Sequence, residues 1–144
     1  MLCQTANKEN VNWPDYNTAL LAVVGYREAR GEGPEGIRAV MNVIKNRVNA
    51  GWGDWSRVMS GKNQFTSISV PGDRETVVWP MKPDPIFDSC MQIATDVYSG
   101  TSPDTTGGAL FYGNPHDLTS QWFINNVVNK RTKTVTIGHH DFYK

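Results

Sequence analysis

The chain has 144 residues, enough for one domain that buries its own core. Its 14 basic and 14 acidic residues cancel, so charge gives no argument for a nucleic acid or an anionic membrane surface as partner. No window of the sequence approaches the apolar length that a membrane span requires. Composition therefore favours a single globular domain over residues 1–144, with residues 1–14 as an N-terminal extension.

The first predicted helix covers residues 16–30, where Asp15 or Asn17 can cap its start and Gly31 and Gly33 stop it. The second predicted helix, residues 34–49, has the clearest pattern, because Pro34 suits a first helical turn and apolar residues recur at helical spacing. Those apolar residues are Ile37, Val40, Met41, Ile44 and Val48.

A short helical turn is expected over residues 55–59, followed by an irregular segment at 60–84 that is rich in turn-forming residues. The third long helix is predicted over residues 85–99. Its expected buried residues are Ile86, Cys90, Ile93, Ala94 and Val97.

The C-terminal part of the chain is predicted to be less regular. An exposed loop at 100–107 precedes a short strand at 109–112, a helical stretch at 116–125 and a strand at 132–137. Helices dominate, so the fold class is α+β and mainly α. The tryptophans are expected in the core, and they are Trp13, Trp52, Trp55, Trp79 and Trp122.

The junction between the first two helices carries the strongest signal of chemistry. Three carboxylates, Glu28, Glu32 and Glu35, lie where one apolar helix stops and the next begins. Helical spacing places Glu28 on the face of Leu21 and Gly25, in an apolar setting that disfavours the charged carboxylate. A general acid that works near neutral pH needs this environment. The alternative is a solvated helix end whose acids pair with neighbouring arginines.

Four blocks of sequence, which span roughly residues 18–143, carry a resemblance to a known family. They are Glu28-Ala29-Arg30-Gly31-Glu32 with the residues that follow to Val48, then Gln64-Phe65-Thr66-Ser67-Ile68, then Gly108-Ala109-Leu110-Phe111-Tyr112-Gly113-Asn114-Pro115, and last Ile137-Gly138-His139-His140-Asp141-Phe142-Tyr143. In this order they resemble the SleB-like cell wall hydrolases, which are spore-cortex lytic enzymes and their phage relatives.

The resemblance implies a lysozyme-like domain, similar to goose-type lysozyme, lytic transglycosylases and resuscitation-promoting factors. It implies a glycosidase that cuts the MurNAc-β-1,4-GlcNAc bond of peptidoglycan, by preference as a lytic transglycosylase. In that mechanism one Glu, here Glu28, acts first as acid and then as base, and the 6-hydroxyl of the substrate closes an anhydro ring. No second carboxylate is then obligatory.

A hydrolytic muramidase is the alternative, and a two-carboxylate enzyme places the second carboxylate about 5 to 9.5 Å from the acid. Glu32 is one turn further along the chain, with its Cα about 6 Å away if the helix persists. Asp73 and Glu75 could also approach. Capping or an arginine pair is the other interpretation of Glu32, and Glu35 suits a first helical turn, where the helix dipole favours acids.

Candidate sugar-binding residues stand at the matched family positions. Gln64 with Phe65, and Tyr112 with Asn114, combine an aromatic ring with an amide, which suits a saccharide groove. Phe65 could instead be core, and Asn114 could only turn the chain before the following proline. His140 is expected to be a hydrogen-bonding group near the catalytic acid.

Three histidines, with Asp117 and Asp141 nearby, raise the question of a metal. They are His116, His139 and His140. Zinc amidases and peptidases of the cell wall use such ligands, but neither HExxH nor His-x-His spacing occurs, and His139 and His140 would point to opposite faces of a strand. We therefore expect no metal and no cofactor, and Cys3 and Cys90 are too few for a disulfide framework.

The setting of the protein is also an expectation. No secretory signal is evident at the N-terminus, and no separate wall-binding domain follows, so we expect a monomer that is made in a host cytoplasm and acts on the bacterial cell wall. A phage endolysin, released by a partner such as a holin, fits these features. The rival classes are a zinc amidase or peptidase and a non-catalytic lysozyme-like module that binds glycan or serves in a virion.

Overall fold

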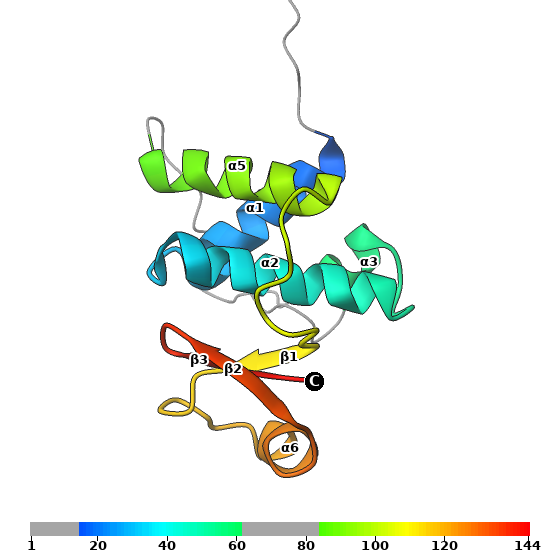
Figure 1. Cartoon of the computed structure of the whole chain (residues 1–144), viewed down its shortest axis with the longest axis vertical. Helices are drawn as coiled ribbons and strands as arrows, with labels where there is room; N and C mark the ends of the chain where they lie inside the picture. The colour runs from blue at the N-terminus through cyan, green and yellow to red at the C-terminus, as the bar shows by residue number, and fades with distance from the viewer. Residues whose placement is uncertain (1–14, 62–83) are drawn as a thin grey trace, which may run out of the picture.

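The computed structural model describes residues 15–61 and 84–144. A layer of helices lies on one side, a small sheet lies beneath it, and a short helical segment lies beyond the sheet (Figure 1). The helical layer consists of α1 (Tyr16–Ala29), α2 (Gly33–Asn49), α3 (Trp55–Ser60) and α5 (Pro85–Ser99). This mainly helical architecture with a little sheet confirms the predicted fold class. That residues 1–144 form one domain stays a prediction, and residues 1–14 lie outside the described part of the chain.

The helix ends follow the local chemistry of the sequence. The Asp15 carboxylate accepts a hydrogen bond from the backbone N–H of Asn17 at 3.4 Å and so caps α1. Asp84 caps α5 by accepting from the backbone N–H groups of Ile86 and Phe87 at 3.0 and 3.1 Å. Gly100 ends α5 with φ of 83°, a left-handed conformation that glycine adopts without steric cost. The predicted bounds of these helices are confirmed to within about a residue.

Helix α2 lies between two cores because it is apolar on two faces. Its predicted face, which includes Ile37 and Ile44, packs against α1, α3 and α5 in the main core. A second face, with Ala39 and Val43, packs against Phe142 of the sheet. The sequence pattern indicated the first face only, because two small apolar residues form the second one.

The sheet is antiparallel, with strand order β1-β3-β2. Its strands are β1 (Phe111–Gly113), β2 (Lys133–Ile137) and β3 (His140–Tyr143). Strand β3 lies in the middle, and Phe142 pairs with Tyr112 on one side and with Val135 on the other. The sequence analysis assigned no strand to 140–143, where two polar residues precede Phe142 and Tyr143.

A helical segment covers the far face of the sheet. Helix α6 (Gln121–Phe123) continues into a π-helical turn, η2 (Ile124–Val128), and Val127 packs against Phe111 and Tyr143. The helix was predicted from residue 116, but it begins only at Gln121, where the Ser120 hydroxyl caps the backbone N–H of Phe123 at 3.2 Å.

The structure tests the predicted burial of Cys90, Ile86 and the tryptophans. Cys90 is fully buried, as expected, whereas Ile86 is 46 % exposed in the first turn of α5. Trp52 and Trp122 are 38 % and 62 % exposed, so the expectation that they belong to the core is wrong. Trp13, Trp79 and Cys3 lie outside the described residues. Within the described part of the chain, no helix has the length and apolar character to cross a bilayer.

Candidate active site

Glu28 lies in the last turn of α1 and is half-buried. Its Oε2 atom accepts a hydrogen bond from the Tyr112 hydroxyl at 3.3 Å. Its other oxygen, Oε1, is buried and makes no hydrogen bond to any residue that the structure describes. The carboxyl group is therefore held through one oxygen, and the second has unused hydrogen-bonding capacity among the described residues.

Tyr112 is the partner that holds Glu28, and β1 positions it. Burial, and then the negative charge of Glu28, raise the pKa of Tyr112 well above its usual value, although Arg47 opposes this shift. The phenol therefore stays protonated at physiological pH and acts as a hydrogen-bond donor to the carboxylate. Tyr112 also lines the groove described below, and a contact between this residue and substrate stays a prediction.

His140 stands at the start of β3, behind Tyr112. The two rings meet edge to face, with centroids 5.1 Å apart. Burial lowers the pKa of His140, against the opposing effects of Glu32 and Glu28, so the ring is mostly neutral at pH 7. Its Nδ1 atom is buried without a hydrogen-bond partner among the described residues. The structure thus places His140 in ring contact with Tyr112, and its expected role as a hydrogen-bonding group near the acid stays a prediction.

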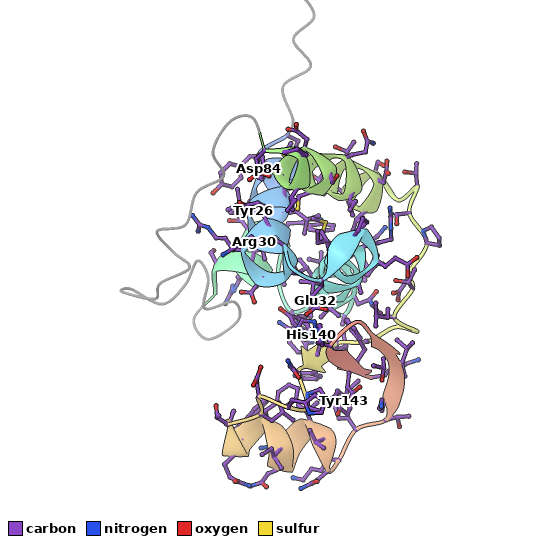
Figure 2. All side chains as sticks on the ribbon, turned by 90° about the vertical axis from the view of Figure 1, so that its left-hand side faces the viewer. Tyr26, Arg30, Glu32, Asp84, His140 and Tyr143 are labelled. Atoms are coloured by element: carbon purple, nitrogen blue, oxygen red, sulfur yellow. The ribbon has the colours of Figure 1, made fainter. Side chains whose placement is uncertain are left out.

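Glu32 occupies a different environment from Glu28. Its Oε2 atom accepts from the backbone N–H of His139 at 3.0 Å, and its Oε1 atom lies 3.1 Å from the Nδ1 atom of the same residue. Burial raises the pKa of Glu32, but these bonds from His139 outweigh burial and leave it below its ordinary value. Figure 2 shows Glu32 and His140 together, where the helices meet the sheet. Glu32 is the N-cap residue of α2, yet its side chain makes no capping hydrogen bond.

Two glycines make room for the Glu32 side chain. A Cβ atom at Gly138 would overlap Glu32 Oε2, and one at Gly36 would overlap Glu32 Cβ. Gly138 also has φ of 59°, in the left-handed region that glycine tolerates. We call this arrangement of Glu32, Gly36, Gly138 and His139 the hairpin clasp, because it ties the β2–β3 turn to the start of α2. It favours a structural role for Glu32, and a direct part for Glu32 in catalysis stays a prediction.

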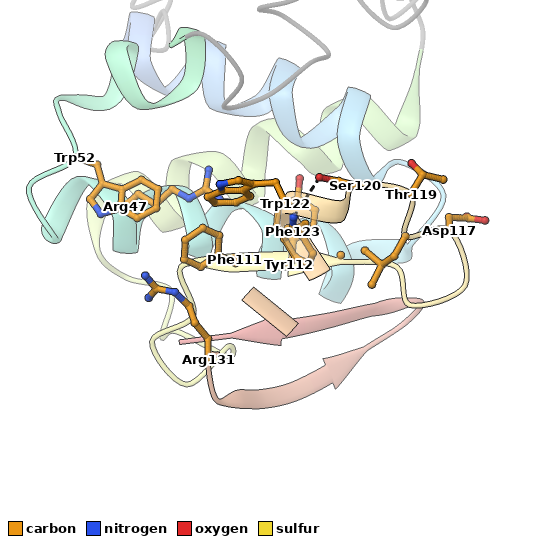
Figure 3. Close-up of a pocket in the computed structure, with 12 residues that line it drawn as sticks. Arg47, Trp52, Phe111, Tyr112, Asp117, Thr119, Ser120, Trp122, Phe123 and Arg131 are labelled. Carbon is orange, nitrogen blue, oxygen red and sulfur yellow. Dashed lines mark hydrogen bonds between the residues drawn. The ribbon is translucent and has the colours of Figure 1, made fainter. Parts of the chain in front are cut away.

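A groove of about 970 Å³ opens beside Tyr112 (Figure 3). Arg47 and Trp52 lie at one end of the view, Asp117 lies at the other, and Trp122 and Phe123 of α6 lie across it. Exposed tryptophan faces beside polar side chains are suited to a saccharide, whose ring faces are apolar and whose edges carry hydroxyl groups. Trp52, Trp122 and Arg47 were not predicted at the groove. No spacing pattern in the sequence separates a groove tryptophan from a core one.

The remaining candidate residues have different outcomes. Asn114 uses its side chain locally, because its Oδ1 accepts from the backbone N–H of His116 at 3.0 Å and its Nδ2 donates to Asp117 at 3.1 Å. These local bonds fit the alternative interpretation, in which Asn114 only turns the chain before Pro115. A contact between Asn114 and substrate stays a prediction. Glu35 is exposed in the first turn of α2, as expected.

Other predicted residues lie outside the described part of the chain. They are Gln64, Phe65, Asp73 and Glu75. Their roles stay predictions. Within residues 15–61 and 84–144, no three His, Cys, Asp or Glu side chains are grouped as a metal site would need.

Comparison with known proteins identifies the family. Residues 31–143 match the cell wall hydrolase family. The chain is 33 % identical over 127 residues to the spore cortex-lytic enzyme of Oceanobacillus iheyensis, covering 87 % of this chain and 40 % of that protein. It is 31 % identical over 141 residues to the spore cortex-lytic enzyme of Halalkalibacterium halodurans, covering 96 % of this chain and 38 % of that protein. The chain thus spans about two fifths of the length of these curated relatives.

Solved structures agree with the sequence matches. The catalytic domain of the germination-specific lytic transglycosylase SleB from Bacillus anthracis superposes with a TM-score of 0.70 at 29 % identity, covering 93 % of this chain and 98 % of that one. The catalytic domain of Bacillus cereus SleB gives a TM-score of 0.67 at 31 % identity, covering 96 % and 99 %. The chain belongs to the SleB-like cell wall hydrolases and has the lysozyme-like fold of their catalytic domains.

Proposed function

We propose that this protein cleaves the glycan strands of peptidoglycan between MurNAc and GlcNAc, with Glu28 as the general acid. The observation that carries the proposal is the asymmetry of the Glu28 carboxyl group. One oxygen accepts the Tyr112 hydroxyl, and the other is buried without a partner among the described residues. Since Oε2 is engaged as an acceptor, Oε1 is the natural site for the proton that the leaving oxygen receives.

The chemistry proceeds in two proton transfers. Glu28 gives its proton to the glycosidic oxygen as the bond from that oxygen to C1 of MurNAc breaks, and positive charge develops on the sugar ring. Glu28 is then a carboxylate and can remove the proton of the 6-hydroxyl of the same sugar, so that the 6-oxygen bonds to C1. The products are an anhydro-muramyl end and a free GlcNAc 4-hydroxyl, and Glu28 regains its proton.

The hairpin clasp supports this single-carboxylate mechanism over a two-carboxylate hydrolysis. Both oxygens of Glu32 are engaged by His139, so a second acid that would hold a water or attack the sugar would first have to leave the clasp. The match to a solved domain described as a lytic transglycosylase points the same way. A hydrolytic muramidase is the second candidate, because the same acid with a bound water would give hydrolysis.

Mass spectrometry of the muropeptides released from purified peptidoglycan tests the proposal. Anhydro-muramyl ends are expected. Reducing muramyl ends would make the protein a muramidase, and free peptides with intact glycan would make it an amidase. Activity that a chelator abolishes would also favour the zinc class, whereas no release at all would favour a non-catalytic glycan-binding module.

The biological setting stays a prediction. A phage lysin made in a host cytoplasm should accumulate late in infection and cause lysis only when a holin-like partner is present. Detection of the protein as a stable part of purified virions would instead favour an entry enzyme. Light scattering coupled to size-exclusion chromatography tests the expected monomer.

A further inference from the structure

The groove beside Tyr112 continues into a second hollow that is rich in positive charge. This hollow, of about 490 Å³, shares Phe111, Trp122 and Arg131 with the groove and is also lined by Lys130 and Lys144. We call Lys130 and Arg131 the cationic end of the groove.

The two side chains of the cationic end are available for an anion. Both are exposed, and neither forms an ion pair with a carboxylate of the described residues. The guanidinium carbon of Arg131 lies 4.6 Å from the centre of the Phe111 ring. This stacking orients the guanidinium and leaves the N–H groups at its edge free to bind a carboxylate through two hydrogen bonds.

A continuous series of contacts links the cationic end to the catalytic acid. Tyr112 donates to Glu28, and Arg47 lies close enough to Tyr112 to influence its pKa. The guanidinium carbon of Arg47 lies 5.0 Å from the ring centre of Trp52 and 5.5 Å from that of Phe111, the ring on which Arg131 also stacks. Asp117 lies at the opposite end of the groove from Arg47 (Figure 3). Among the described residues that line the groove, the positively charged side chains are Arg47 and Arg131, and both lie at the end opposite Asp117.

We propose that the cationic end binds a free carboxylate of the peptide stem attached to a MurNAc residue of the strand. The inference rests on the proposed function and names the part of the substrate that the groove selects. The sugar rings of peptidoglycan carry hydroxyl and acetamido groups, which are neutral. Its stem peptides carry negative charge, on their terminal carboxylates and on carboxylates of their side chains. The enzyme should therefore prefer strands whose stem carboxylates are free over strands in which they are blocked.

The test uses two preparations of the same peptidoglycan. In one the stem carboxylates are intact, and in the other a carbodiimide has coupled them to methylamine, which makes neutral amides without removing the stems. Both are first freed of teichoic acid with hydrofluoric acid, so that phosphate groups cannot act as the anion. The measured quantity is the kcat/KM for release of new glycan ends from each preparation.

The expected result is faster cleavage of the free-carboxylate preparation, by about threefold to tenfold, because solvent-exposed charge contacts are weak individually. The double variant Lys130→Gln, Arg131→Gln should remove most of this preference and leave cleavage of the amidated preparation nearly unchanged. Arg131→Lys keeps the charge and should retain most of the preference. Arg57→Gln, at an exposed arginine of α3 that does not line the groove, is the charge-matched control and should behave as wild type.

The outcomes separate the two proposals. If wild type cleaves both preparations equally, or if the double variant loses activity on both to the same extent, the stem-carboxylate inference is wrong while the glycosidase proposal stands. A preference that appears only when teichoic acid is left in place would assign the cationic end to phosphate and also overturn the inference. If wild type cleaves neither preparation, the proposed function itself fails.

Discussion

Glu28 and Glu32 stand on either side of the turn between α1 and α2, and their surroundings differ. Glu28 is held through one oxygen by Tyr112 and keeps a buried oxygen without a partner among the described residues. Both carboxylate oxygens of Glu32 contact His139, and the side chain of Glu32 occupies space that two glycines leave open. A carboxyl group suited to proton transfer keeps part of its hydrogen-bonding capacity unused, because an acid whose hydrogen bonds are complete has none left for substrate.

Glu28→Gln should have the largest effect on activity. The amide keeps the size of the carboxyl group but has no proton to transfer, and loss of general acid catalysis costs about 10² to 10⁴ in rate. Because the same residue is also the proposed base, we expect the upper end of this range in the rate of muropeptide release. Thermal unfolding should change little.

Glu35→Gln is the matched control, since Glu35 belongs to the same sequence motif but is exposed in the first turn of α2. Its activity should equal that of wild type. Near-native turnover by Glu28→Gln together with an inactive Glu32→Gln would reverse the assignment of the two acids.

Gly138→Ala should break the hairpin clasp and cost the most stability. The alanine would adopt an unfavourable positive φ, and its Cβ would overlap Glu32 Oε2, for a combined loss of about 2 to 4 kcal/mol in the free energy of unfolding. Gly33→Ala is the control, because Gly33 has φ of 74° but open space around its Cβ position. It should cost only about 1 kcal/mol, and chemical denaturation measures the difference. Equal losses would mean that the contact with Glu32 contributes nothing.

Tyr112→Phe should lower activity while leaving the fold intact. It removes the O–H that donates to Glu28 Oε2, and a hydrogen bond to a charged group is worth about 1.5 to 3 kcal/mol. We expect a loss of about tenfold to a hundredfold in kcat, because the carboxyl group of Glu28 is then no longer held in place by the phenol. Tyr16→Phe, at a tyrosine that is 69 % exposed, should leave kcat unchanged. A wild-type kcat for Tyr112→Phe would contradict the role assigned to the phenol.

Glu32→Gln should have the smallest effect, and its size should depend on pH. The folded protein lowers the pKa of Glu32, so the ionised form stabilises the folded state above the ordinary glutamate pKa of about 4.3. This contribution disappears as the pH falls through the lowered value. At pH 7 the variant should lose less than about 1 kcal/mol, because His139 is exposed and solvent screens the pair.

Denaturant unfolding at several pH values measures this dependence. The stability difference between wild type and Glu32→Gln should shrink as the pH falls from about 5 to about 3. A difference that grows in acid would contradict the assigned direction of the pKa shift.

The helices were predictable because their signals are local. Asp15 and Asp84 cap the helices that follow them, and Gly100 stops α5, each through contacts within a few residues. Apolar periodicity likewise indicated the main-core face of α2. Helical spacing together with the family resemblance indicated Glu28 as the candidate acid.

Local sequence signals were therefore enough to predict the mainly helical fold, the helix ends and the position of the candidate acid. Three features depend on tertiary packing: which oxygen of Glu28 is engaged, the contact of Glu32 with a hairpin more than a hundred residues away, and the groove lined by Trp52 and Trp122. Strand β3 also belongs to this second group, because its place in the middle of the sheet depends on pairing with β1 and β2. The physical reason is common to all of these features. Capping and periodicity act over a few residues, whereas a long-range contact depends on how separate elements pack, which no local pattern of residues records.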